Sequence, residues 1–349
     1  LNILIILGVK PMTTQASIQK WISNWLLSQR LSTDFSTHLL LGDGSSRSFY
    51  RVLGKNQSYI LISDPQWTQT QDYPSHQQFL ETLGLPVPKF LNYEASLGFL
   101  LMQDLGDELL QFRINSDPKS KLAWLKAAIS LLADLHGKTF PVPENLPVTS
   151  RFFDADKYFS ELQYTLEYLH QKLLNGSRTS DSNLKELANF CRTIAQIEPS
   201  VFSHRDYHCR NMIIQNNQLW LIDFQDARMG APHYDIASLL YDAYVPLNDI
   251  DRQELLKTYR NQISQYPVGQ KISWHIFESD LKQVAFQRTL KAAGSFASFF
   301  IRFGKVTHWP YLIPALNSAL HLQKSGYGVK SSVIDIEKWI ALISQIKIQ

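Results

Sequence analysis

The chain has very few cysteines, because its 349 residues include only Cys191 and Cys209, which form no CxxC pair. A disulfide framework or a cysteine-built zinc site is therefore excluded. The chain also lacks an excess of either charge, since 34 Lys and Arg against 31 Asp and Glu give a formal net charge of +3. So weak a field argues against nucleic acid as a partner. The composition fits a protein of the reducing cytoplasm.

The beginning of the chain offers no membrane anchor. Its apolar run, LNILIILGV, covers about nine residues, whereas a membrane-spanning helix needs about 20. The run also lacks the basic start of a signal peptide. Because residue 1 is Leu, we expect Met12 to be the natural start and residues 1–11 to be additional translated sequence.

The remaining composition, 44% apolar and 19% charged residues, is typical of a globular protein, and the length predicts two lobes. Apolar residues at helical spacing predict a helix over residues 17–27. Short β-prone runs and turns fill residues 39–105, and longer helical patterns follow residue 117. We therefore predict an α+β, bilobal fold: an N-terminal extension and helix (1–37), a small β-rich N-lobe that covers a nucleotide (38–106), and a mostly helical C-lobe (107–349).

Two helical patterns in the C-lobe carry specific predictions. Residues 120–137, SKLAWLKAAISLLADLHG, place apolar side chains on one face and are expected to end at Gly137. Residues 286–305, FQRTLKAAGSFASFFIRFGK, read as a core-facing helix from which Arg288 and Lys291 snorkel outward. The stretch GDELLQFRINSDP, residues 106–118, is interpreted as the passage between the lobes.

Polar chemistry concentrates in FSHRDYHCRN, residues 202–211, which is followed by NMIIQNNQLWLIDF, residues 211–224. Two short β-prone runs flank Asn216 and Asn217, residues that tolerate positive φ, so we predict a hairpin. Its register would pair Met212 with Leu221 and would set Asn211 beside Asp223. One open end of the hairpin would then gather two carboxylates and an amide.

Such a group suits phosphoryl transfer. Magnesium commonly takes one or two protein carboxylates together with substrate phosphates, and Asn211 and Asp223 provide a partial shell of that kind. An aspartate held near the acceptor hydroxyl accepts its proton, and Asp206 is the candidate. The order HRDYHCRN then IDF matches the protein-kinase pattern of catalytic Asp, Asn five residues on, and a metal-binding Asp after a hairpin.

The segment LIDFQDARMGAPHYDIASLL resembles the aminoglycoside phosphotransferase family, the small-molecule branch of the protein-kinase-like fold. More narrowly, GDGSSRSFYRV, GLPVPKFL, GFLLMQDLGD, HRDYHCRN and QRTLKAAGSFA together are similar to bacterial anomeric kinases of N-acetylmuramate and N-acetylglucosamine used in cell-wall recycling. These matches run from about residue 39 to residue 305. The resemblance implies an ATP- and Mg²⁺-dependent kinase of a small-molecule sugar, acting as a monomer without nucleic acid or membrane.

The resemblance also implies where the nucleotide lies. The glycine turn GDGSSRS would cover the phosphates, because small residues let backbone N–H groups approach anionic oxygens. A typical kinase has a strand lysine that pairs the phosphates, but SYILISDP has none, so an arginine that flanks the turn would replace it. The adenine would meet the backbone of the segment between the lobes. The candidate nucleotide-binding residues are Gly42, Gly44, Ser45, Ser46, Arg47, Arg51, Gln103, Asp104 and Leu105.

Several other residues are candidates for contact with the substrate or for structural support, and some of them have two interpretations. His208 faces the acceptor or only fills space, and Arg288 binds a polar or carboxylate group of the acceptor or serves packing. His204 is expected to bond buried backbone near Asp223, and the resemblance implies that Asp235 ties its helix to the catalytic loop. Asp226 is read either as a contact to a second ion or as a hydrogen-bonded loop acid.

Three alternatives remain open at this point. The acceptor could be an aminoglycoside, choline or homoserine, although balanced charge argues against a polycationic drug. The missing strand lysine is compatible with a nucleotide-binding pseudokinase. A Ser/Thr protein kinase is disfavoured, because the DFG and APE motifs are absent from the sequence.

Overall fold

The structure is a computed structural model that describes residues 15–40, 47–64 and 72–347. The expected start at Met12 lies outside these residues. The chain divides into two compact units, residues 1–78 with 88–105 and residues 79–87 with 106–349. In the described ranges, no helix is both long and apolar enough to cross a membrane.

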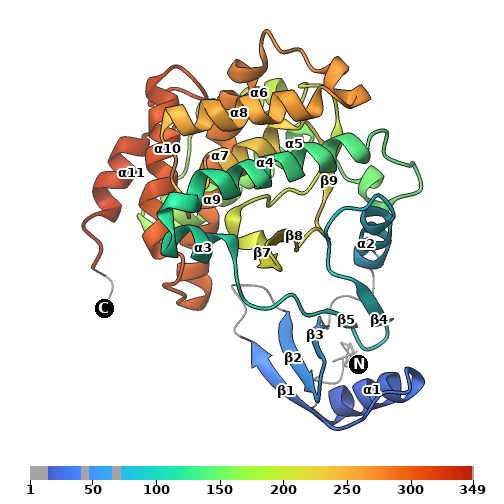
Figure 1. Cartoon of the computed structure of the whole chain (residues 1–349). Helices are drawn as coiled ribbons and strands as arrows, with labels where there is room; N and C mark the ends of the chain where they lie inside the picture. The colour runs from blue at the N-terminus through green and yellow to red at the C-terminus, as the bar shows by residue number, and fades with distance from the viewer. Residues whose placement is uncertain (1–14, 41–46, 65–71, 348–349) are drawn as a thin grey trace, which may run out of the picture. The chain divides into compact units, whose positions relative to one another are not determined.

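The first unit is built on an antiparallel sheet, which among the described residues has five strands in the order β1-β2-β3-β5-β4 (Figure 1). Its strands are β1 (Phe35–Leu40), β2 (Ser48–Gly54), β3 (Ser58–Ser63), β4 (Phe90–Glu94) and β5 (Phe99–Gln103). Central strand β3 is rich in apolar and β-branched residues, as a strand buried on one face requires. The predicted β-rich region is confirmed, and it begins four residues earlier than expected, at Phe35.

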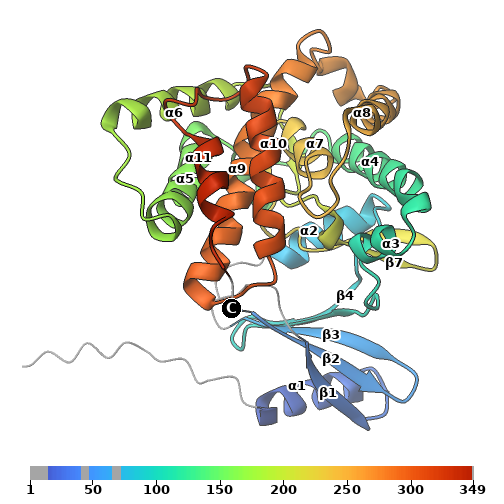
Figure 2. The ribbon, with the colours of Figure 1, turned by 90° about the vertical axis from the view of Figure 1, so that its left-hand side faces the viewer.

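Helix α1 (Gln15–Ser28) supplies the core of this sheet, as Figure 2 shows. Its buried side chains recur at helical spacing and pack against residues of β2, β3 and β5. The cluster consists of Ile18, Ile22, Trp25, Leu26, Val52, Leu61, Phe99 and Leu101. The predicted first helix is therefore confirmed. Helix α2 (Asp72–Thr82) follows β3 in the chain.

The second unit is mostly helical. Its helices are α3 (Leu110–Ser116), α4 (Lys121–Lys138), α5 (Ala155–Thr165), α6 (Asp181–Ile194), α7 (His233–Leu240), α8 (Asp249–Ile263), α9 (Phe277–Phe303), α10 (Leu312–Lys324) and α11 (Ile336–Ile343). The 27-residue helix α9 packs against α5, α7 and α10, and Figure 2 shows it beside α10. A β-rich first part and a helical second part confirm the predicted α+β fold class.

The predicted hairpin is present in the second unit. Strands β7 (Met212–Gln215) and β8 (Gln218–Leu221) pair Met212 with Leu221, in the expected register. Asn216 and Asn217 both have positive φ, 51° and 59°, which matches the right-handed twist of a two-residue hairpin turn. Just before the hairpin, β6 (Val201–Ser203) pairs with β9 (Arg228–Gly230).

Two local predictions were wrong. Helix α4 continues past Gly137 to Lys138, and a Cβ at Gly137 would lie 2.3 Å from the ring of Tyr266. That glycine therefore permits close packing and does not end the helix. Residues 110–116, expected to be part of a connecting passage, form helix α3 of the second unit.

Candidate active site

The segment 204–211 joins β6 to the hairpin and is fastened to helix α7 by two buried carboxylates. Asp235, in the first turn of α7, accepts hydrogen bonds from the backbone N–H groups of His204 at 2.7 Å and Arg205 at 2.9 Å. Asp242, just beyond α7, accepts one from the N–H of Cys209 at 2.9 Å. These bonds hold Arg205 at a positive φ of 78°, which costs a non-glycine residue about 1–3 kcal/mol.

Side chains of the segment add further anchors. The His204 ring donates through Nε2 to the carbonyl oxygen of Ile222 at 2.9 Å, the buried-backbone contact expected from the sequence. The Tyr207 hydroxyl donates to the carbonyl oxygen of Ala128 in α4 at 2.7 Å. His136 of α4 reaches Asp235 through Nε2 at 3.2 Å. The loop is thus pre-organised by buried hydrogen bonds from two helices.

The carboxylate of Asp206 lies against two cations of helix α9. Lys291 Nζ is 2.8 Å and Arg288 Nη2 is 3.4 Å from Asp206 Oδ1. The expected outward snorkelling was wrong, because only 8% of the Arg288 side chain and 14% of the Lys291 side chain are exposed. Arg288 is additionally held by its Nε, which donates to Ser238 Oγ at 2.8 Å.

These cations determine the charge state of Asp206. Burial alone would raise its pKa, but Lys291, Arg205 and Arg288 together lower the pKa well below its usual value. Asp206 is therefore ionised throughout the neutral range. A carboxylate of this kind orients an acceptor hydroxyl and accepts its proton only as the phosphoryl group departs, which suits a loose transition state.

A second buried acid, Glu161 of α5, completes the charged cluster. It pairs with Lys157 at 3.0 Å and lies 3.9 Å from Arg205, which also reaches Asp226 at 3.5 Å. Burial raises the pKa of Glu161, but Lys291, Lys157 and Arg205 lower it overall. Lys157, Arg205, Arg288 and Lys291 thus face three acids: Asp206, Glu161 and Asp226. Asp242 also acts electrostatically on Arg288, so the formal charges of this cluster balance.

Asn211 and Asp223 lie together at the open end of the hairpin. Asn211 Nδ2 donates to the carbonyl oxygen of Asp206 at 2.9 Å and lies 3.5 Å from Asp223 Oδ2. Its amide oxygen is therefore left for a ligand. Gln225 donates to the other Asp223 oxygen at 2.7 Å, and Asp223 itself has a φ of 66°.

This donor set fits a hard cation that also binds phosphate. One carboxylate and one amide oxygen are the partial shell that Mg²⁺ accepts, with the remaining positions left for water and phosphate oxygens. Within the described ranges, no cluster of three or more His, Cys, Asp or Glu could hold a metal ion by itself. A metal at Asp223 and Asn211 would therefore complete its coordination with water or with oxygens of a bound molecule.

His208 lies inside the loop, with its ring 5.4 Å from that of Tyr244. Burial lowers the pKa of His208 to about 3, and the nearby Arg288 and Lys291 add to this effect, although Asp206 opposes it. The ring is neutral above pH 5 and brings no cation to the acceptor. Its contact with substrate stays a prediction.

The predicted nucleotide-binding residues that the structure describes belong to the first unit. Gly42, Gly44, Ser45 and Ser46 lie outside the described residues. Arg47 pairs with Asp64 at 3.1 Å, and Arg51 pairs with Asp104 at 2.8 Å.

Strand β5 ends at Gln103, and Asp104 and Leu105 follow it in the chain. The N–H of Gln103 donates to the carbonyl oxygen of Lys89 at 2.9 Å, and Leu105 is buried. Nucleotide binding by Gln103, Asp104 and Leu105 stays a prediction, as does the role of the two arginines.

Sequence reasoning missed Lys291, Glu161 and Gln225 as parts of this site. Lys291 and Glu161 are 85 and 45 residues from Asp206, so no local motif connects them to it. The available signal was the composition of α9, in which charged residues interrupt a run of large apolar side chains. A buried charge requires a partner, and Asp206 is that partner.

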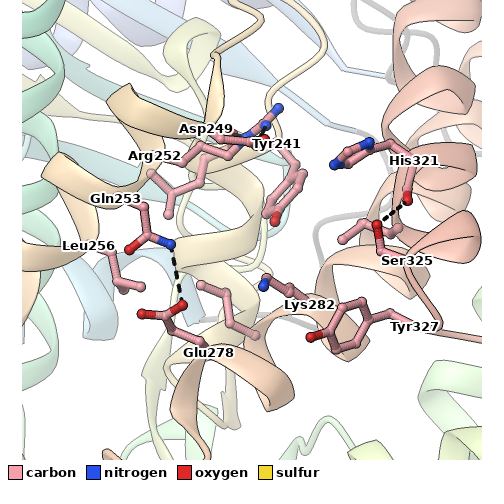
Figure 3. Close-up of a pocket in the computed structure, with 13 residues that line it drawn as sticks. Tyr241, Asp249, Arg252, Gln253, Leu256, Glu278, Lys282, His321, Ser325 and Tyr327 are labelled. Carbon is pink, nitrogen blue, oxygen red and sulfur yellow. Dashed lines mark hydrogen bonds and ion pairs between the residues drawn. The ribbon is translucent and has the colours of Figure 1, made fainter.

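A separate pocket of about 240 Å³ lies among α7, α8, α9 and α10. Figure 3 shows Tyr241, Arg252, Lys282, His321 and Tyr327 around it, with Gln253 hydrogen-bonded to Glu278. None of the residues predicted from the sequence as site residues lines this pocket. It is therefore distinct from the acceptor side of Asp206.

Comparison with known proteins gives consistent matches. The phosphotransferase enzyme family (APH) matches residues 37–270, about two thirds of the chain. An N-acetylmuramate/N-acetylglucosamine kinase of Neisseria meningitidis is 25% identical over 308 residues, which cover 85% of this chain and 88% of that protein.

Solved structures share the fold at lower identity. The streptomycin–ATP–APH(2")-IIa ternary complex is 16% identical with a TM-score of 0.55, covering 92% of this chain and 99% of that one. The choline kinase LicA of Streptococcus pneumoniae is 16% identical with a TM-score of 0.60, covering 89% of this chain and 99% of that one. At such identities the structural likeness concerns the fold alone.

Proposed function

Since the chain belongs to the phosphotransferase enzyme family, we propose that it transfers the γ-phosphate of ATP to the anomeric hydroxyl of N-acetylmuramate or N-acetylglucosamine. The observation that carries this choice of acceptor is the pair of cations, Lys291 and Arg288, on the carboxylate of Asp206. Relatives that span most of the chain and carry the name N-acetylmuramate/N-acetylglucosamine kinase point to the same sugars.

The cations discriminate between acceptor classes. An aminoglycoside is a polycation and choline carries a quaternary ammonium, so either would bring positive charge toward Lys291 and Arg288. Two like charges about 4 Å apart repel by about 1 kcal/mol in water and about 4 kcal/mol near a protein surface. A neutral N-acetylated sugar avoids this penalty, and a lactyl carboxylate would be attracted by Lys291 and Arg288.

The residues of the second unit have distinct roles in this proposal. Asp206 orients the acceptor hydroxyl and receives its proton, while the hydrogen bonds of Asp235 and Asp242 keep the loop in place. Asn211 and Asp223 hold Mg²⁺, which when bound offsets phosphate charge. His208 and Arg288 face the sugar.

In the first unit, Arg51 takes the part of the absent strand lysine. Its guanidinium is held by Asp104 at 2.8 Å, as the lysine of a typical kinase is held by a glutamate. Arg47, paired with Asp64, is the second arginine beside the glycine turn.

The direct test measures ATP consumption by the full chain with N-acetylmuramate, N-acetylglucosamine, kanamycin and choline in parallel. We expect turnover with the two N-acetylated sugars and an acid-labile product, because an anomeric phosphate hydrolyses in mild acid, whereas a phosphate ester of the hydroxymethyl group does not. Faster turnover with kanamycin or choline would contradict the proposed acceptor. Tight ATP binding without turnover on any acceptor would instead favour a pseudokinase.

A substitution of Asp206 tests the role assigned to this residue. Asp206→Asn keeps the size of the side chain but removes the acceptor of the proton, so kcat should fall by about 10²–10⁴. Binding of ATP, measured by calorimetry, should change little. Unchanged turnover would reject Asp206 as the catalytic residue.

A further inference from the structure

Lys291 is a buried cation that the proposal has so far used only to exclude cationic acceptors, without a part in the transfer itself. Among the described residues its ammonium group makes one hydrogen bond, to Asp206 Oδ1 at 2.8 Å. Burial lowers its pKa overall, and Arg288 and Arg205 add to this effect, although Asp206 and Glu161 oppose it. A buried lysine with so few partners needs a functional or structural reason to be present.

Arg288, the other cation of α9 that contacts Asp206, is held by more groups than Lys291. Arg288 is anchored by Ser238 Oγ at 2.8 Å, and its guanidinium lies over the ring of Tyr234 at 5.8 Å from the centroid. Arg205 is shared between Glu161 and Asp226. Lys291, by contrast, presents a compact charge on a flexible four-carbon stem that can exchange one anionic partner for another.

The chemistry of transfer places Lys291 close to the moving phosphoryl group. The acceptor oxygen has to lie within hydrogen-bond reach of Asp206, about 3 Å, and the same oxygen forms the new bond to phosphorus. Lys291 lies 2.8 Å from the Asp206 carboxylate.

We propose that Lys291 is a further catalytic residue, which passes from Asp206 to the phosphoryl group as transfer proceeds and offsets its negative charge. The inference rests on the proposed kinase function. In the step, the acceptor oxygen bonds to the γ-phosphorus, and the bond from phosphorus to the bridging oxygen breaks with its electron pair going to ADP. The hydroxyl proton moves to Asp206, and Lys291 keeps its own proton throughout.

The test compares Lys291→Met with Lys291→Arg in the full chain. Loss of a transition-state cation should lower kcat about 10²–10³-fold in the Met variant, with the KM values for ATP and sugar within about threefold of wild type. The Arg variant keeps the charge and should recover at least about a tenth of kcat. Lys282→Met, on the same helix about two and a half turns earlier, serves as the control and should match wild type.

A second measurement needs no turnover. Calorimetry measures the binding of ADP and Mg²⁺, first alone and then with aluminium fluoride and the sugar, where the fluoride mimics the transferring phosphoryl group. The Met variant should bind ADP normally and should lose about 10²-fold in affinity for the fluoride complex. Equal loss of kcat in Met and Arg variants of normal thermal stability would overturn the proposal. A raised sugar KM at normal kcat would also overturn it. Absence of turnover in wild type would instead reject the proposed function.

Discussion

Replacing Asp235 tests whether the catalytic loop depends on helix α7. Its buried carboxylate accepts hydrogen bonds from two backbone N–H groups and from His136. Each buried donor left without a partner costs about 1–3 kcal/mol, so Asp235→Ala should lower the free energy of unfolding by about 2–6 kcal/mol through the two backbone donors alone. That is a large part of the roughly 5–15 kcal/mol that stabilises a typical protein.

Asp235→Asn should lie between wild type and the alanine variant, because its amide oxygen can still accept one of the two N–H groups. The midpoint of urea unfolding gives the stability order, and kcat measured well below the unfolding temperature gives the effect on the loop. Arg205 would lose the bond that holds its positive φ, so we expect kcat to fall in the Asn variant even where the protein is folded. Asp249→Ala, whose side chain is 75% exposed, is the control and should cost at most about 1 kcal/mol. An alanine variant of Asp235 as stable as this control would refute the reasoning.

Two further predictions concern the first unit and a buried histidine. Arg51→Ala should raise the KM for ATP about tenfold to a hundredfold, the worth of one hydrogen bond to a charged group, and leave the sugar KM unchanged; normal nucleotide kinetics would remove Arg51 from the site. Burial lowers the pKa of His233 to about 3, below its unfolded value of about 6.5, so the unfolded state binds more protons and stability falls as pH drops below about 6.5. His233→Phe, which keeps a ring against Phe277 at 4.1 Å, should therefore gain stability relative to wild type between pH 7 and 5 in urea unfolding. A constant difference across this range would contradict the assignment.

The hairpin and the residues it brings together were predictable because their determinants are local. Asn216 and Asn217 permit one tight turn, and the alternation of apolar residues on both sides leaves one register that buries Met212 and Leu221. A side-chain period of two residues then fixes the neighbours of each position. For this reason Asn211 and Asp223 could be placed together before any coordinates were known.

The surroundings of Asp206 could not be predicted in the same way. The periodicity of α9 shows that the helix is buried, but it does not show which element covers the face that carries Arg288 and Lys291. That depends on packing against α5 and α7, which brings Asp206 to residues more than 80 positions away. Sequence reasoning placed Lys291 in solvent, because exposure is the usual position of an isolated Lys, and for Arg288 it left open a contact with the acceptor.

The segment 204–211 is hydrogen-bonded near both of its ends to helix α7 or to the residues just after it. Asp235, in the first turn of the helix, accepts from the N–H of His204, and Asp242, just after the last turn, accepts from the N–H of Cys209. Any shift of that helix should therefore carry Asp206 and Asn211 along together and preserve the spacing between these two residues. Mutations far from the sugar that displace α7 should consequently impair all acceptors alike, whereas a change of acceptor preference has to be sought on α9.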